Sequence, residues 1–292
     1  MFWLGGGGEV FIAEKRTCAR MLPHHHVAIA LAVAALVQGG ALAAEHAAPR
    51  AMEACAGASA ALTAAATLLA RGTFFPRQLA CTALMVAWGW RLSWHLARRH
   101  VETRLTARRL CMARTLWATF VALPVVAVNT LQAEPAPLGP VAVAGALLAA
   151  AGLALETAAD RQKAEWHAAH PLRPDSAATE PPVCTVGAWA WSRHPNLFGE
   201  ACFHCGLYAL VAAVTPPVVA AAPLATVLTV AWLPTGPLRT LEREKSAVFA
   251  GHPAYLKYAM RTSPFIPMPS NLYVWAWQSC PKFCEQACCA GV

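Results

Sequence analysis

Residues 192–200, SRHPNLFGE, hold Arg, His, Asn and Glu side chains close together in the chain. Pro195 has no backbone N–H to donate and fits the first turn of a helix, so the sequence predicts that a helix begins there. In such a helix Asn196 and Glu200 are four residues apart and lie on one face. Polar acceptors of this kind suit ribose hydroxyls and a nicotinamide.

Arg193 and His194 stand directly before this helix start, where free backbone N–H groups attract anions. We therefore expect a cradle for a phosphorylated cofactor. The alternative is an ordinary charged collar at the end of a membrane span.

A second polar cluster lies in the segment GLALETAADRQK. Glu156, Asp160 and Lys163 follow the spacing i, i+4, i+7 and so share one face of a helix. Their carboxylates can accept hydrogen bonds from ribose hydroxyls or an adenine amine. The alternative is a solvated helix end with an acid–base pair.

A third cluster extends from Glu242 to Arg261, in which Tyr255 and Tyr258 are three residues apart and share a helix face. Arginine forks suit phosphates, and Arg193, Arg243 and Arg261 would supply them at one membrane face. The three clusters together are what a dinucleotide needs. No G-x-G-x-x-G opens a strand–helix unit, so a Rossmann site is not expected.

The composition indicates which elements must position these clusters. The chain has 292 residues, of which 57% are hydrophobic and 13% charged, against about 25% charged in a soluble domain. Its mean hydropathy is +0.43. The net charge of +8 forms no basic face on a soluble domain, which argues against nucleic-acid binding. The eleven cysteines show no paired CxxC spacing, so no metal site is expected.

We expect an all-α fold, a multispan transmembrane helix bundle of about seven spans. The apolar runs cover residues 27–44, 55–70, 78–96, 116–131, 141–154, 201–214 and 218–233. The first run can instead be a cleaved signal peptide, which would leave six spans. The second run, rich in Ala and Thr, is the weakest. The arginine-rich loop 98–114 should be cytosolic, and alternation then places the C-terminus in the cytosol.

The chain divides into three parts by this pattern. Residues 1–26, with GGGG and three adjacent His, are expected to be a flexible N-terminal segment, and residues 27–267 a membrane domain. Residues 268–292 form a Cys-rich tail, whose thiols could be palmitoylated, bind metal or stay unmodified. Within the third run, Arg91 should face a polar cavity or extend to the membrane surface.

Four segments resemble the steroid 5-alpha-reductase-like membrane family, in particular a poorly characterised branch of it, and the resemblance covers about residues 78–267. The segments are WGWRLSWHLARR, LETAADRQK, SRHPNLFGE and LEREKSAVFAGHPAYLKYAMRTSPFIP.

The resemblance implies NADPH bound between helices from the cytosolic side, and hydride transfer to a carbon–carbon double bond conjugated to a carbonyl. It implies cofactor contacts by Asn196 and Glu200. Asp160 would lie near the nucleotide. Further cofactor-binding positions by this resemblance are Arg193, His194, Glu242 and Tyr255.

One position departs from the steroid-reducing members. They carry a Tyr three residues before the Arg of the W-G-x-R-L segment, and this chain has Trp88 there, whose N–H can donate but is not an acidic hydroxyl. A steroid substrate is therefore in doubt. The electrophilic donor that an enone needs could be Arg91, or Glu200 in its protonated form.

The sequence thus predicts a membrane-embedded, NADPH-dependent reductase of a double bond in an apolar lipid or sterol-like substrate from the bilayer. Two other functions remain open. The first is a membrane methyltransferase of the isoprenylcysteine or phospholipid type using S-adenosylmethionine, whose RHP segment usually continues with Tyr rather than Asn196. The second is a non-catalytic membrane protein that retains the fold. An endoplasmic-reticulum location follows from the resemblance alone.

Overall fold

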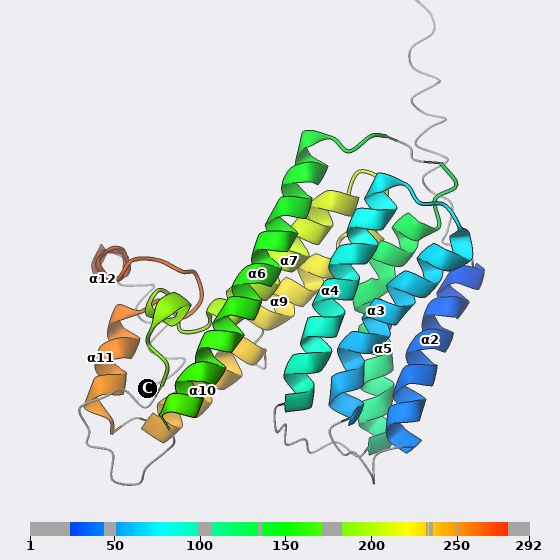
Figure 1. The fold of residues 1–292 in the computed structure, drawn as a ribbon. Coiled ribbons are helices and arrows are strands. Elements are labelled where there is room, and N and C mark those ends of the chain that lie inside the picture. Colours follow the sequence, from blue (N-terminus) through cyan, green and yellow to red (C-terminus); the bar gives the residue numbers. More distant parts are fainter. Residues whose placement is uncertain are drawn as a thin grey trace, which may run out of the picture. The chain divides into compact units, whose positions relative to one another are not determined.

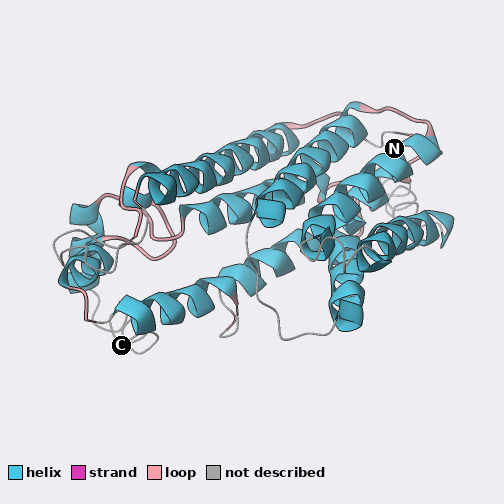
Figure 2. Cartoon of the chain, turned by 60° about the horizontal axis from the view of Figure 1, so that its bottom comes forward, coloured by secondary structure: helices cyan, strands magenta, loops and turns pink. Residues whose placement is uncertain are grey.

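The computed structural model describes the chain in segments, and every regular element in them is a helix (Figure 1). The described residues are 24–43, 51–98, 107–133, 136–170, 183–231, 233, 236–249 and 251–279. The all-α expectation is confirmed for this part of the chain, and Figure 2 draws no strand in it. Most of the expected flexible N-terminal segment, the start of the polar linker after His170 and the Cys-rich end of the tail lie outside the described residues.

The chain forms two compact units, and two long helices contribute to both. The first unit contains the residues up to Leu147 together with Gly206–Pro223. The second contains Leu148–Cys205 and the residues from Leu224 onward. The two shared helices are α6 (Pro140–Ala169) and α7 (Pro195–Val211).

In the first unit, four helices pack as a bundle with polar groups inside it (Figure 1). They are α2 (His24–Ala43), α3 (Ala51–Arg71), α4 (Pro76–Arg98) and α5 (Ala107–Asn129), and the short α8 (Pro217–Ala220) follows α7. The amide of Asn129 is buried and donates to the Ala64 carbonyl at 3.0 Å and to the Thr67 hydroxyl at 3.1 Å. Side-chain hydrogen bonds between helices are a common device of helix bundles in lipid.

In the second unit, shorter helices surround the end of α6 and the start of α7. They are the 3₁₀ turn η1 (Gly187–Ala190), α9 (Ala222–Ala231), α10 (Pro237–Phe249), α11 (Pro253–Arg261) and α12 (Ser270–Ser279). Leu197 of α7 packs with Val230 of α9 and Leu238 of α10, and Phe265 covers this apolar cluster. The cluster fixes α10 against the start of α7.

Within the described residues, each of the seven apolar runs is largely helical. The helix expected to carry the charged cluster after the fifth run is confirmed, because α6 continues through Lys163 to Ala169. The seventh is divided into α8 and α9 at Ala221. Pro223 explains the division, because it lacks an N–H and its ring would clash with a carbonyl four residues earlier.

Length and composition allow one helix of the described chain, α6, to cross a membrane. Shorter apolar helices cover Ala28–Gly40, Cys55–Arg71, Thr115–Asn129 and Pro217–Ala231. A single helix of this kind is weak support for a membrane protein, so the multispan arrangement is not confirmed here.

Candidate functional site

The second unit holds the polar clusters, and a close crossing of α6 and α7 sets their position. A Cβ on Gly199 would meet the Gly152 carbonyl oxygen at 2.7 Å and the Glu156 amide nitrogen at 2.7 Å, so only glycine allows the two backbones to approach this closely. One turn beyond the crossing, the Asn196 amide donates to Asp160 Oδ1 at 3.1 Å. Asp160 of α6 and Asn196 of α7, which the sequence predicted in separate polar clusters, therefore contact each other.

The 3₁₀ turn η1 is fastened to the same face of α6. The Trp189 indole N–H donates to the Ala159 carbonyl at 2.9 Å, and the Ala188 N–H donates to Gln162 Oε1 at 2.9 Å. Gly187 has φ +61°, which favours glycine, and a Cβ there would strike the Gln162 side chain. These contacts bury Trp189 against α6.

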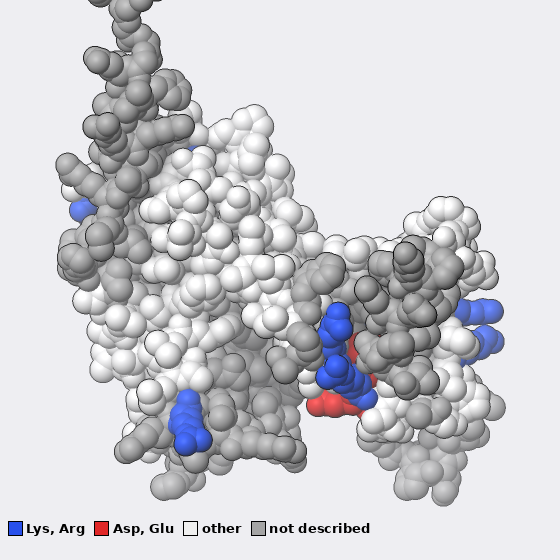
Figure 3. Space-filling view, turned by 180° about the vertical axis from the view of Figure 1, so that it is seen from behind, with Lys and Arg blue, Asp and Glu red and all other residues white. Residues whose placement is uncertain are grey.

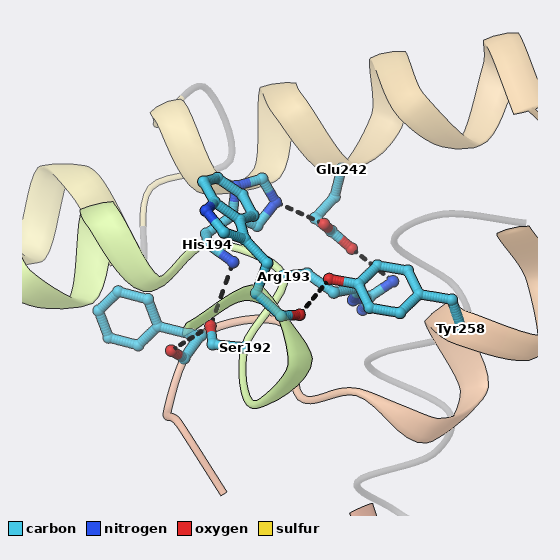
Figure 4. Close-up of polar contacts among 7 residues, drawn as sticks. Ser192, Arg193, His194, Glu242 and Tyr258 are labelled. Carbon is cyan, nitrogen blue, oxygen red and sulfur yellow. Dashed lines mark hydrogen bonds and ion pairs between the residues drawn. The ribbon is translucent and has the colours of Figure 1, made fainter. Parts of the chain in front are cut away.

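The SRHP segment is tied to the chain that follows α11 (Figure 4). The Ser192 hydroxyl donates to the Phe265 carbonyl at 2.8 Å and accepts from the His194 N–H at 3.1 Å. The Arg193 N–H donates to the Ser263 carbonyl at 2.8 Å, next to an isolated bridge between Ser192 and Ser263. The backbone before α7 is therefore fixed by residues about 70 positions later in the chain.

Glu242 of α10 joins Arg193 and His194 through its two carboxylate oxygens (Figure 4). Oε2 lies 2.8 Å from Arg193 Nη1 and Oε1 lies 2.5 Å from His194 Nε2. The side chains of Arg193, Glu242 and His194 are only 14%, 15% and 2% exposed. At such low exposure, removing one partner would leave an uncompensated buried charge, which is strongly destabilising.

The protonation states follow from burial and from this pairing. Burial lowers the pKa of His194 to about 4, although the Glu242 hydrogen bond opposes the shift. Burial alone would raise the pKa of Glu242, but the His194 hydrogen bond and the Arg193 charge outweigh it and lower the pKa. At neutral pH the neutral imidazole thus donates from Nε2 to an ionised carboxylate.

Two tyrosines of α11 border the same cluster. The Tyr258 hydroxyl donates to the Trp189 carbonyl at 2.7 Å, and burial raises its pKa (Figure 4). Tyr255 is 2% exposed, and burial likewise raises its pKa. Both hydroxyls therefore stay protonated in the physiological range.

Two lysines lie close to Trp189. Lys163 Nζ of α6 is 5.3 Å and Lys245 Nζ of α10 is 5.7 Å from the centroid of its ring, within the range of a cation–π contact. Burial and the Lys163 charge lower the pKa of Lys245 to about 8, although the Glu242 charge opposes the shift. The site thus contains the ammonium groups of Lys163 and Lys245 in addition to the Arg193 guanidinium that pairs with Glu242.

Several buried polar atoms of the site lack a hydrogen bond of standard geometry with the residues that the structure describes. They are Asn196 Oδ1, Arg193 Nε and the Tyr255 hydroxyl oxygen. Buried polar atoms are normally satisfied, and exceptions mark places where a water, an ion or a ligand binds. The donor and acceptor types present suit the carboxamide, ribose and phosphate groups of a dinucleotide.

Six of the eight residues singled out from the sequence fall into two contact groups of the second unit. Asp160 lies with Asn196, and Arg193, His194 and Glu242 form one group with Tyr255 beside Arg193. Glu200 is half-buried one turn after Asn196 on α7. Arg91 is half-buried on α4 of the first unit. In the same helix Trp88 is fully buried, with its ring centroid 5.8 Å from that of Trp117.

The sequence did not indicate that several other residues belong to the site. Ser192, Trp189 and Lys245 make contacts that hold or charge it. No spacing pattern in the sequence indicated Lys245, because only the fold brings it near Lys163. Arg243 and Arg261, expected as phosphate ligands, are exposed.

Among the described residues, no group of three or more His, Cys, Asp or Glu side chains could hold a metal ion. Comparisons with curated proteins and with solved structures give no match. One family model, described as "Protein of unknown function (DUF1295)", matches residues 43–262, which is well over half of the 292 residues. The chain therefore belongs to the DUF1295 family.

Proposed function

We propose that this protein is a membrane-embedded, NADPH-dependent reductase of a carbon–carbon double bond in an apolar lipid or sterol-like substrate. The observation that carries the proposal is the cationic, incompletely hydrogen-bonded site of the second unit, with Asn196 Oδ1 and Arg193 Nε buried beside the Glu242 group. The resemblance to the steroid 5-alpha-reductase-like family supports it through the same residues.

The apolar character of the exposed surface supports a membrane location with several spans. Large apolar side chains are highly exposed, for example Leu36 at 75%, Val141 at 72% and Leu69 at 70%. On the face in Figure 3, the described charged side chains form a few small groups, and the surface between them is uncharged. We propose the seven-span arrangement with a cytosolic C-terminus, in the endoplasmic reticulum.

The residues present fit NADPH. Arg193 and the lysines supply charge for phosphates, and Asp160 supplies an acceptor for ribose. Asn196 and Glu200, on one face of α7, would hold the nicotinamide end. When bound, NADPH would supply a hydride to the substrate double bond.

The chain's own groups have separate tasks in this proposal. Glu242 fixes the Arg193 guanidinium, and neutral His194 keeps the carboxylate in place from the other side. Asp160 orients the Asn196 carboxamide by accepting from its amide. Protonated Glu200 would donate to the carbonyl oxygen where negative charge develops during reduction of an enone.

The charge of the site disfavours the methyltransferase alternative. S-adenosylmethionine carries a sulfonium, an ammonium and a carboxylate group and is net positive, whereas NADPH carries several negative charges. Lys163, Lys245 and Arg193 would repel the first and attract the second. The non-catalytic alternative retains one specific observation in its favour, which is the buried Trp88 at the position of the carbonyl-polarising Tyr.

Equilibrium binding of NADPH and of S-adenosylmethionine to the detergent-purified protein tests the proposal. NADPH should bind, and Asn196→Ala should weaken it about tenfold, the usual cost of losing one hydrogen bond near charge. Asn271→Ala, at an exposed position of α12, is the matched control and should bind like the wild type. Saturable binding of S-adenosylmethionine alone would replace the reductase by the methyltransferase, and NADPH binding without turnover of any enone would favour the non-catalytic protein.

A further inference from the structure

Helix α11 has two faces of opposite character, and its inner face belongs to the site. On this inner face Tyr255 is buried, and the Tyr258 hydroxyl donates to the Trp189 carbonyl at 2.7 Å. Shortly after the helix ends, the Ser263 carbonyl accepts a hydrogen bond from the Arg193 N–H. These contacts fix the rotation of α11 about its own axis, so its outer face has a fixed orientation in the second unit.

The outer face of α11 combines apolar side chains with cations. Leu256 and Met260 are four residues apart and exposed, Met260 to 67%. Lys257 and Arg261, also exposed, each follow one position later and form a parallel row beside them. At about 100° per residue, the four side chains span an arc of about 140°. Apolar side chains bordered by Lys and Arg are typical of a helix that lies in a membrane surface.

The chain after α11 exposes further large apolar side chains. They are Ile266, Leu272 and Trp275, the last exposed to 63%. Leu272 and Trp275 are three residues apart on α12, which contacts α11. Tryptophan is enriched in membrane proteins at the boundary between lipid and water. This much exposed apolar surface on neighbouring helices indicates that another molecule covers it in the functional protein.

The charge of this region indicates what covers it. Residues 251–279 contain two cations, Lys257 and Arg261, and no Asp or Glu. Neither cation has an ion pair with a residue that the structure describes. The hydrocarbon core is a poor position for such charges, because they are costly there. The headgroup layer suits them, because their aliphatic stems can lie along apolar surface while the charged ends reach phosphate groups.

We propose that the outer face of α11, formed by Leu256, Lys257, Met260 and Arg261, lies in the headgroup layer of the bilayer and binds anionic lipid there. The inference rests on the membrane location proposed above. Charge complementarity selects the occupant, because the cytosolic leaflet carries anionic lipids and the face carries cations. The inner face of the same helix borders the site, so the site lies within about one helix diameter, about 10 Å, of the lipid headgroups.

Photocrosslinking in vesicles tests which molecule covers this face. The full-length protein is reconstituted with phosphatidylcholine and phosphatidylserine at about four to one, which gives the membrane surface a negative potential. Met260 is replaced by p-benzoylphenylalanine, and the crosslinked molecules are identified by mass spectrometry. The same photoreactive residue at Leu147, which is 66% exposed, is the positive control for lipid contact. At Ala168, exposed near the polar end of α6, it is the negative control.

Position 260 should form crosslinks with lipid, as position 147 does, and position 168 should form none. At position 260 the ratio of crosslinked phosphatidylserine to phosphatidylcholine should exceed the ratio in the vesicle at least about fivefold, the contribution of one cation near an anionic surface. Lys257→Gln and Arg261→Gln should each lower this ratio about two- to fivefold for the same reason. Arg109→Gln, at an exposed position of α5 with the same change of charge, should leave it unchanged.

Absence of lipid crosslinks at position 260, with lipid crosslinks at position 147, would overturn the proposal and leave the membrane location intact. Crosslinks from position 260 to a second copy of the chain would assign the face to a protein interface and overturn it as well. A phosphatidylserine ratio equal to that of the vesicle would overturn the selection of anionic lipid. Absence of lipid crosslinks at both positions would instead contradict the membrane location in the proposed function.

Discussion

Glu242 is the residue on which the geometry of the site depends, because it contacts two functional side chains at once. Its carboxylate lies between Arg193 and the buried imidazole of His194, although Glu242 comes 48 residues after His194 in the chain. The sequence predicted each of these residues singly as a cofactor contact. It could not show that they bind one another, because nothing in local spacing relates α10 to the start of α7.

Replacing Glu242 by Gln should release Arg193 and weaken both the fold and cofactor binding. The neutral amide cannot compensate the guanidinium charge, so the free energy of unfolding of the site should fall by about 1–3 kcal/mol. Thermal unfolding in detergent and NADPH titration measure the two effects. Glu244→Gln, at an exposed position of the same helix, should change neither. An Arg193→Ala variant that binds NADPH as the wild type does would show that the pairing does not serve the cofactor.

Acid should destabilise the second unit through His194. Its pKa in the folded protein is about 4, below the ordinary value of 6.5, so the unfolded chain takes up a proton first as the pH falls. Stability is therefore full above about pH 6.5 and decreases as the pH falls toward 4, on the order of 1–3 kcal/mol. The lowered pKa of Glu242 acts in the same direction below its ordinary value of 4.5.

Unfolding midpoints between pH 7.5 and 4 measure this effect. The slope should be much reduced in His194→Gln and unchanged in His170→Gln, whose residue is exposed at the end of α6. A slope that persists in His194→Gln would assign the acid sensitivity to other groups.

At the scale of elements, the crossing of α6 and α7 decides whether Asp160 and Asn196 meet. Gly152 and Gly199 allow backbone contact between the two helices, and the polar residues lie one to two turns away from them. The i, i+4 spacing on each helix correctly predicted which residues share a face. The sequence could not predict that these two helices pack against each other at their glycines, because a glycine in an apolar helix can pack against many other helices.

Gly199→Ala should therefore be destabilising even though Ala is the better helix former. Its Cβ would meet two α6 backbone atoms at 2.7 Å, and overpacking of this kind costs about 1–3 kcal/mol. Gly40→Ala, where the added Cβ meets nothing within 4 Å, should be neutral or stabilising. Thermal unfolding of both variants checks the contrast. A Gly199→Ala protein as stable as the wild type would mean that the helices are further apart.

The elements themselves were largely predictable, because long uncharged runs leave few alternatives to a helix. Pro195 correctly marked the start of α7. The spacing of Glu156, Asp160 and Lys163 also correctly predicted a helix after the fifth apolar run, because α6 carries all three residues as far as Ala169. The tie between Ser192 and Phe265 had no signal in the sequence.

At the scale of the whole molecule, the account requires the site to lie on the cytosolic side of a multispan membrane protein. The arginine-rich loop before α5 and the C-terminus should then both face the cytosol. Reporter tags placed at the C-terminus and in the loop before α6 should be accessible from opposite sides of sealed microsomes, and the protein should resist extraction at alkaline pH. Tags accessible from the same side would contradict the seven-span arrangement.

The central claim is that the second unit binds an anionic dinucleotide, and isothermal titration of the detergent-purified wild-type protein with NADPH tests it most directly. The account predicts saturable binding of about one NADPH per chain, with S-adenosylmethionine failing to compete. No heat of binding with NADPH, or displacement of NADPH by S-adenosylmethionine, would contradict it.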